Sequence, residues 1–376
     1  MCRFFQDNFK SHCDSNQFGC VQGRSATLAL IKFSHHLFNY SDNSDRFVRI
    51  LFVDFTKAFN LINHNTLYSK MTDIQLPPHI SLWFLSFLSD RSQYVSINSS
   101  CSSIKTINAG TPQGTLSGPL DFNLLINDLR FLIEYLKYVD DTTCVSESGD
   151  PLDDSFQHAA DFLVSWCSSN GMKINVPKTK EMLIHFGKIY PVQTIPNARI
   201  DETAVERVRT FKLLGVVFND QLTWTDHVSY IITKASKRIF CIVQLVKSGL
   251  SAHDVVKIYC SIIRSVLEYC CPVWHPGLTS QQSKDIEVIQ KRCLKIIFPD
   301  MLYRDSLAAS NLEKLSDCRE KLTVELFNQI RNPDHLLHSL LTPRNNIKNL
   351  KTNYEFLLPK TKTLRAHRDF INILSL

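Results

Sequence analysis

The sequence predicts an α+β protein in which a mixed region precedes a helical one. Strand-like segments alternate with amphipathic helical segments up to about residue 222, and beyond Trp224 the pattern is helical almost throughout. Hydrophobic residues make up 44% of the 376 residues and glycines number only 11, which indicates a folded chain with a substantial core.

The expected elements before residue 110 follow from apolar periodicity and from the breakers between them. Tyr40–Asp45 is polar and reads as a loop, and Pro77-Pro78 ends the helix that begins after Asn60. In order, we expect a helix over Ala26–Phe38, a buried strand over Phe47–Val53, the helix that ends before Pro77, a helix over Trp83–Asp90 and a hairpin over Arg91–Thr106.

The elements after residue 110 begin with a loop, Gly110–Gly114, that opens a helix. Gly171 is the expected C-cap of the next helix. We expect that helix over Asp153–Asn170, strands over Glu181–Phe186 and Thr210–Phe218, and helices over Ser251–Tyr269 and Ser280–Ile297.

Composition narrows the function classes. Basic residues exceed acidic ones by 42 to 36, a net charge of +6 that is compatible with binding a phosphate backbone. The 12 cysteines form no CxxC pair, so the usual zinc framework is missing. No signal peptide or apolar stretch of roughly 18 residues is found, so we expect an intracellular protein with reduced thiols and no membrane partner, in nucleus or cytoplasm.

Two adjacent aspartates form the most informative feature. An apolar run leads to Tyr138-Val139-Asp140-Asp141, and Thr142–Val145 leads away, which is the pattern of a strand, a tight turn and a second strand. Neighbouring carboxylates repel unless a divalent cation neutralises them. The alternative is an ordinary turn, since Asp suits turns.

A third aspartate, Asp54, follows the apolar segment Phe47–Val53. An acid directly after a buried strand is costly unless it is paired or bound to metal. If the two strands are neighbours, Asp54, Asp140 and Asp141 meet at one sheet edge, which suits a two-metal phosphoryl-transfer site. We expect two Mg²⁺ ions because every candidate ligand is a hard oxygen, with Mn²⁺ as the alternative.

Six motifs occur in an order that resembles the reverse transcriptases of non-LTR (LINE-type) retrotransposons. In family terms these are a fingers motif at Gln17–Ala26 (QFGCVQGRSA), motif A at Val53–His64, motif B from Gly110 to Leu129, motif C at Tyr138–Thr143, motif D at Gly171–Thr179 and motif E at Phe211–Val216. Ser261–Pro299 is similar to the helical region that follows in these elements.

The resemblance implies a right-hand polymerase fold and an RNA-directed DNA polymerase activity. The palm would span residues 47–222, with an inserted fingers segment at about 75–109. Residues 1–46 would be partial fingers and 223–376 a helical thumb and C-terminal region. The enzyme would transfer dNTPs to the 3′-hydroxyl of a DNA primer along an RNA template.

The resemblance also implies roles for individual residues. Asp54, Asp140 and Asp141 would be catalytic and would hold the metal ions, together with the backbone carbonyl of Phe55. Phe59 would be the steric gate against a 2′-hydroxyl. The other expected nucleotide-binding residues are Arg24, Lys57, Gln113, Gly114 and Lys178, and Leu213, Leu214 and Gly215 would form the primer grip. Plainer interpretations remain for these positions: a core Phe, surface Arg and Lys side chains, a helix-opening loop and an ordinary strand.

The chain departs from the family pattern in places. Asn60 replaces an Asp, and Ser117 and Asp121 stand where apolar residues are usual, so a buried Asp121 should be costly unless paired. Only sixteen residues precede Gln17, so we expect an N-terminally truncated copy whose endonuclease is supplied by a full-length element. The competing interpretations are an inactive relic that only binds RNA or an RNA–DNA hybrid, and a maturase-like relative from a mobile intron.

Overall fold

The computed structural model describes residue 9, residues 11–40, 46–185 and 195–342, residue 356 and residues 369–374. The chain divides into two compact units, Met1–Ala29 with Arg46–Val208, and Leu30–Asp45 with Arg209–Leu376. The sequence predicted a boundary after residue 222, whereas this division lies at 208/209. Residues 41–45 of the expected loop, and Phe186, lie outside the described residues.

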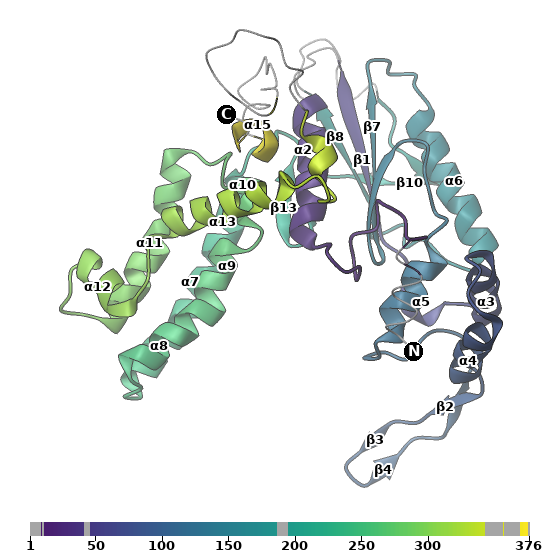
Figure 1. Ribbon diagram of the computed structural model, residues 1–376, viewed down its shortest axis with the longest axis horizontal. Helices are drawn as coiled ribbons and strands as arrows, with labels where there is room; N and C mark the ends of the chain where they lie inside the picture. Colours follow the sequence, from purple (N-terminus) through teal and green to yellow (C-terminus); the bar gives the residue numbers. More distant parts are fainter. Residues whose placement is uncertain are drawn as a thin grey trace. The chain divides into compact units, whose positions relative to one another are not determined.

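The first unit is built on a five-stranded sheet in the order β11-β8-β1-β7-β6 (Figure 1). Every residue of the central strand β1 is buried, as its unbroken apolar sequence predicts. Its neighbours on both sides are antiparallel, and β11 alone runs parallel to its partner. The strands are β1 (Phe47–Val53), β6 (Glu134–Tyr138), β7 (Asp141–Ser148), β8 (Lys180–His185) and β11 (Glu206–Arg207).

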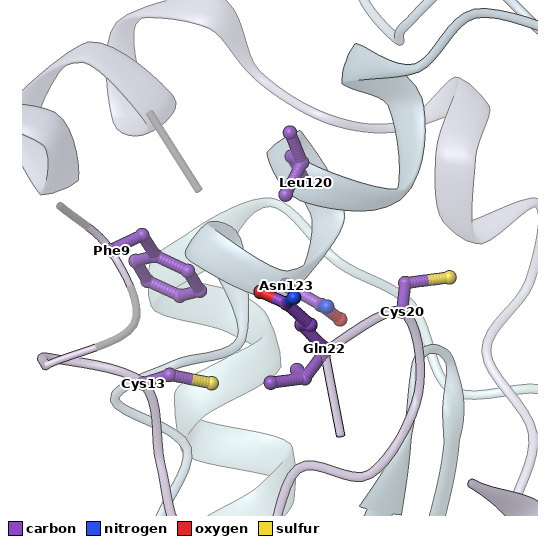
Figure 2. A pocket seen from close by; sticks show the side chains of 7 residues that line it. Phe9, Cys13, Cys20, Gln22, Leu120 and Asn123 are labelled. Atoms are coloured by element: carbon purple, nitrogen blue, oxygen red, sulfur yellow. The ribbon is translucent and has the colours of Figure 1, made fainter. Parts of the chain in front are cut away.

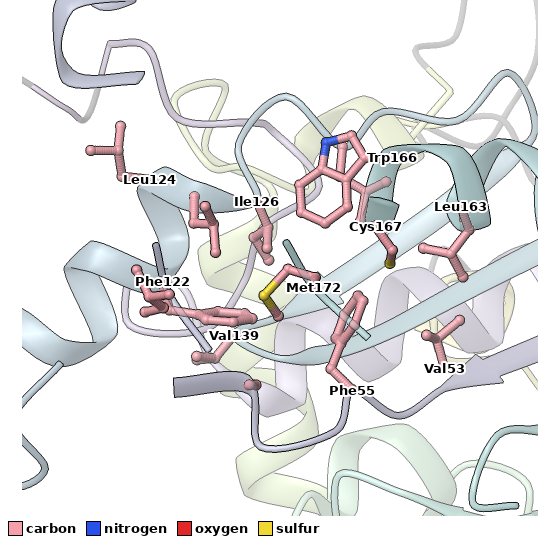
Figure 3. Packing of buried hydrophobic residues seen from close by; sticks show 14 of the residues in the cluster. Val53, Phe55, Phe122, Leu124, Ile126, Val139, Leu163, Trp166, Cys167 and Met172 are labelled. Atoms are coloured by element: carbon pink, nitrogen blue, oxygen red, sulfur yellow. The ribbon is translucent and has the colours of Figure 1, made fainter. Parts of the chain in front are cut away.

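Helices and a hairpin complete this unit. Its core lies where α5, α6 and the strands meet, and includes Phe55, Phe122, Val139, Trp166 and Met172 (Figure 3). The elements are η1 (Ala58–Asn60), α3 (His64–Asp73), α4 (Pro78–Leu88), α5 (Ser117–Leu125), α6 (Ser155–Asn170), β2 (Arg91–Gln93), β3 (Ser96–Ile97), β4 (Ser100–Cys101), β5 (Lys105–Ile107), β9 (Arg199–Ile200) and β10 (Thr203–Ala204). Helix α2 (Ala26–Tyr40) contains residues of both units.

Most predicted boundaries in the first unit agree with the structure. Gly171 caps α6 with a φ of 67°, as expected. The hairpin is also confirmed, with β2 paired to β5 and β3 to β4. Helix α4 begins at Pro78 and not at Trp83, because proline, which lacks an N–H, is well suited to the first turn of a helix.

In its described residues, the second unit has one hairpin, and its remaining regular elements are helices. The single strand expected over Thr210–Phe218 was wrong: it is the hairpin of β12 (Thr210–Leu213) and β13 (Val216–Asn219). Leu214 and Gly215 turn the chain with positive φ values of 46° and 88°, as a two-residue hairpin loop requires. The helices are α7 (Thr225–Lys247), α8 (Ala252–Tyr259), α9 (Ser265–Glu268), α10 (Cys271–Trp274), α11 (Ser280–Ile297), α12 (Tyr303–Ser310), α13 (Leu315–Ile330), the 3-10 turn η4 (His338–Leu340) and α15 (Phe370–Leu374).

The helical prediction beyond Trp224 is confirmed, with expected bounds for one helix and an interruption in another. Helix α11 has the expected bounds and starts with a capping box between Thr279 and Gln282. The helix expected over Ser251–Tyr269 is divided by a π-helical turn, η3 (Cys260–Arg264). Among the described residues, none of the helices has the length and apolar character needed to span a bilayer. The sheet of the first unit and the helices of the second confirm the predicted α+β class.

Candidate active site

Asp54 and the two adjacent aspartates meet at one end of the sheet. Strands β1 and β7 pair antiparallel with Val53 opposite Thr142, so Asp54 and Asp141 are the next residues at the same end. Strands β6 and β7 pair as far as Tyr138 and Asp141, which leaves Val139-Asp140 as a two-residue turn. The predicted neighbourhood of the two strands is confirmed, and it brings the backbones of Asp54 and of the Asp140-Asp141 turn to the same end of the sheet.

The carboxylates of the turn affect one another electrostatically. Partial desolvation, and then the charges of Asp140 and Asp54, raise the pKa of Asp141 to about 6, although its side chain is still exposed to solvent. Desolvation, with a contribution from Asp54, also raises the pKa of the half-buried Asp140. In the described part of the chain no three His, Cys, Asp or Glu side chains are close enough to hold one ion. The three acids are therefore neighbours with unfavourable like charges, not a closed ligand cage.

The backbone of Asp54 is held by the segment before β8. The Asp54 amide donates to Thr179 Oγ1 at 3.2 Å, and its carbonyl accepts from the Asn175 amide at 2.8 Å. Thr179 is fully buried, whereas Lys178 beside it is exposed. The sequence singled out Lys178 here and missed Thr179, which fixes the position of the acid.

Phe59 belongs to η1 and packs against helix α5, and its backbone is hydrogen-bonded to the loop before that helix. Its half-buried ring packs on Phe122, with centroids 5.1 Å apart. The Thr111 amide donates to the Phe59 carbonyl at 3.1 Å. Gly110 has a φ of 80°, and a Cβ there would stand 2.9 Å from the Phe59 carbonyl oxygen. A larger residue at Gly110 would thus displace the backbone that carries Phe59.

Asp121 is the acid whose burial the sequence predicts to be costly in free energy unless it is paired. It is fully buried on α5, and one carboxylate oxygen accepts from Thr111 Oγ1 at 2.8 Å. The other oxygen has no partner among the described residues. Burial raises the pKa of Asp121 to about 7, opposed by the Thr111 hydrogen bond and by the charge of Arg91. Asp121 is therefore only partly paired, and its hydrogen bond with Thr111 joins helix α5 to the loop that contacts Phe59.

Polar groups surround a cavity of about 490 Å³ next to this loop. Arg91 donates to the Gly110 carbonyl at 2.7 Å and lines the cavity together with Asn60 and Gln113. Gln113 and Gly114 are exposed, as is Lys57, whose backbone is left-handed with a φ of 48°. These expected nucleotide-binding residues are accessible to a ligand.

Arg24 makes contacts within its own segment. One guanidinium nitrogen, Nη1, donates to the carbonyls of Asp14 at 2.7 Å and Ser15 at 3.3 Å, and also to that of Gln17. The sequence offered no sign of this arrangement. A role for Arg24 in nucleotide binding stays a prediction, and in this structure its side chain is bound to the backbone of the segment Asp14–Gln17.

The expected primer grip forms the β12–β13 turn in the second unit. Leu213 is buried, whereas Leu214 and Gly215 are half-buried at the turn. Tyr269 donates its hydroxyl to the Leu214 carbonyl at 3.0 Å, and a Cβ on Gly215 would stand 2.9 Å from the Tyr269 ring. Tyr269 therefore supports this turn, a role that the sequence did not indicate.

Comparison with known proteins agrees with the motif order. The family model described as "Reverse transcriptase (RNA-dependent DNA polymerase)" matches residues 2–218, more than half of the chain. Two similar relatives come from Drosophila melanogaster. The chain is 23% identical over 361 residues to a probable RNA-directed DNA polymerase from transposon BS, and 25% identical over 336 residues to the RNA-directed DNA polymerase from mobile element jockey.

These relatives are much longer than this chain. The matches cover 89% and 82% of this chain but only 38% and 36% of the two relatives. Among solved structures, the apo telomerase from Candida tropicalis overlaps with a TM-score of 0.46 at 13% identity, over 90% of this chain and 54% of the other.

Proposed function

The chain belongs to the reverse transcriptase (RNA-dependent DNA polymerase) family, and on that basis we propose that it is a retrotransposon enzyme that adds dNTPs to a DNA primer along an RNA template. The observation that carries the proposal is the meeting of Asp54 with the Asp140-Asp141 turn at one end of the sheet. Carboxylates arranged in this way are the usual ligands of the metal ions that assist phosphoryl transfer.

The oxygen chemistry of the three carboxylates suits a divalent cation, although in this structure their side chains are not close enough together to hold one ion. The carboxylate oxygens are the hard ligands that Mg²⁺ prefers. Desolvation first, and then the charges of neighbouring carboxylates, raise the pKa values of Asp140 and Asp141, and a bound cation would offset both effects. Asp54, Asp140 and Asp141 would hold two ions with help from the Phe55 carbonyl. The ions would activate the primer 3′-hydroxyl and neutralise charge on the departing pyrophosphate. We favour Mg²⁺, with Mn²⁺ as a substitute.

The chain's own residues would orient the nucleotide. Phe59, whose carbonyl accepts from the Thr111 amide at 3.1 Å, would exclude a 2′-hydroxyl at the sugar. The exposed Gln113 and Gly114 would lie against the incoming nucleotide and template, with Lys57, Arg24 and Lys178 near its phosphates. Leu214 and Gly215, backed by Leu213, would support the primer end.

The remaining partners follow from the same proposal. The substrates would be an RNA template, a DNA primer and the four dNTPs. By analogy with complete elements, the primer end would arise at a nick made by an endonuclease of a full-length element. The chain would then act on a hybrid of A-form shape, which proteins recognise through phosphates and 2′-hydroxyls.

Primer extension tests the proposal. A poly(rA)–oligo(dT) hybrid with dTTP and Mg²⁺ should be extended by the wild-type chain. Asp140→Asn should lose at least about a hundredfold in rate, because it removes a metal ligand. Asp154→Asn is the matched control, since this aspartate is exposed in the same unit, and it should extend normally. Extension that survives Asp140→Asn refutes the site, and hybrid binding without any extension favours the inactive relic.

A further inference from the structure

The segment Asn16–Phe18 pairs with the edge of the hairpin that carries Asp140 and Asp141, through an isolated β-bridge. Strand β6 is the last strand of the sheet, and Gln17 makes a parallel bridge with Lys137 on it. The Phe18 amide donates to the Lys137 carbonyl at 2.7 Å, and the Lys137 amide donates to the Asn16 carbonyl at 2.8 Å. The segment expected to be part of the fingers therefore covers the open edge of the sheet that carries Asp140 and Asp141.

Gln17 reaches from this segment to the turn itself. Its side chain is 2% exposed, and Oε1 accepts from the Val139 amide and from the Gly19 amide, both at 2.9 Å. Val139 has a φ of 58°, a left-handed conformation that β-branched residues rarely adopt because it is strained. Gln17 thus holds a strained peptide immediately before Asp140.

Close packing restricts the same turn from a second side. A Cβ on Gly19 would stand 2.5 Å from the Val139 amide nitrogen and from its Cγ2, so only glycine fits there. Asn123 on α5 donates through Nδ2 to the Gly19 carbonyl at 2.8 Å. Figure 2 shows Asn123 beside Gln22 and near Cys20, which belong to the same segment. The turn is therefore connected through Gly19 to the helix that follows the Gly110 loop.

We propose that Gln17 is a positioning residue for the metal-binding turn: its side-chain oxygen fixes the Val139 peptide and thereby sets where Asp140 presents its carboxylate. This inference rests on the proposed function, since it assumes that Asp140 is a metal ligand. Groups that orient metal ligands without touching the ion affect metal affinity by about 10–100-fold when they are removed. The effect of Gln17 should therefore appear first in the requirement for Mg²⁺.

The test compares Gln17→Met with Gln22→Met. Methionine keeps the length and fills the buried site, but it lacks the accepting oxygen. Gln22 is an exposed glutamine on the same segment and serves as the control. In primer extension on poly(rA)–oligo(dT), Gln17→Met should raise the half-saturating Mg²⁺ concentration by about 10–100-fold. Binding of the hybrid, and the KM for dTTP at saturating Mg²⁺, should stay within about twofold of wild type.

A second measurement needs no polymerase activity. Hydrogen exchange of the Val139 amide should be about tenfold or more faster in Gln17→Met, while exchange in β1 and β8 is unchanged. An unchanged Mg²⁺ requirement in an active Gln17→Met protein overturns the inference. If the wild type extends no primer, the proposed function fails, and an unchanged Val139 exchange rate then overturns the role of Gln17 separately.

Discussion

Substituting Lys137 by Met should strongly destabilise the first unit. The Lys137 side chain is fully buried, and its ammonium group contacts Asp14 Oδ2 at 2.7 Å. It also donates to the carbonyls of Ile126 at 2.8 Å and Leu129 at 3.0 Å. Lys137→Met would leave the Asp14 carboxylate buried without its partner, since Asp14 is only 4% exposed.

The magnitude follows from this burial. Removing one member of a buried ion pair costs about 3–5 kcal/mol, because the remaining charge has no compensation. For a domain of this size, 1 kcal/mol corresponds to about 2–4 °C in Tm, so the loss should be about 6–20 °C. Adding Asp14→Asn should recover much of it, because the amide is neutral: its oxygen can still accept from the Asn16 amide, and its NH2 can donate to the Tyr135 hydroxyl oxygen.

Calorimetry would measure these differences in Tm. It would compare the wild type, Lys137→Met, the double variant and an exposed control, Lys105→Met.

The pH dependence of stability gives an independent check. Burial alone would raise the pKa of Asp14, but its ion pair with Lys137 outweighs burial and holds that pKa below its usual range. This contribution to stability is present above the unfolded value of about 3.9 and is lost as the pH falls below it. A Lys137→Met protein within about 1 kcal/mol of wild type would refute the reasoning.

Three further predictions concern other buried groups. Burial raises the pKa of Asp121 in the folded protein to about 7, so the free energy of unfolding of the wild type should fall by up to about 4 kcal/mol as the pH rises from 4 to 7. In urea unfolding, Asp121→Asn should remove this dependence of stability on pH. Burial lowers the pKa of His227 to about 4, so the neutral side chain does not reduce stability above pH 6.5, and the free energy of unfolding should fall by about 3 kcal/mol as the pH falls to 4. A stability that does not change with pH, or a pH dependence that His227→Gln leaves unchanged, would contradict this. Tyr269→Phe should cost about 1 kcal/mol through its lost bond to the Leu214 carbonyl, measured by urea unfolding against Tyr94→Phe, whose ring is exposed; equal stability of the two would count against that role.

The elements that the sequence predicted best are those whose pattern is local. The apolar run Phe47–Val53 became the buried central strand, and the helix over Ser280–Ile297 has its expected bounds because its cap and its periodicity are both local signals. The convergence of Asp54 with Asp140 was also foreseen, since both follow strand patterns.

What the sequence did not reveal depends on contacts between distant residues. Gln17 and Val139 are brought together only by the bridge along β6, and no local pattern identifies the partner of a buried glutamine side chain. Likewise, the hydroxyl of Thr111 meets Asp121 because the loop folds back on α5. The turn at Leu214-Gly215 was missed because a leucine with positive φ carries no sequence signal of its own.

The most direct test of the proposed metal site is iron-directed cleavage of the chain. Fe²⁺ can occupy oxygen-ligand sites and, with ascorbate and peroxide, cuts the backbone close to where it is bound. With the hybrid and dTTP present, the account predicts cuts near Asp54 and near Asp140 that excess Mg²⁺ suppresses and Asp140→Asn abolishes. Cleavage at only one of these segments, or cleavage that Asp140→Asn leaves unchanged, would contradict the claim that the three carboxylates form one site.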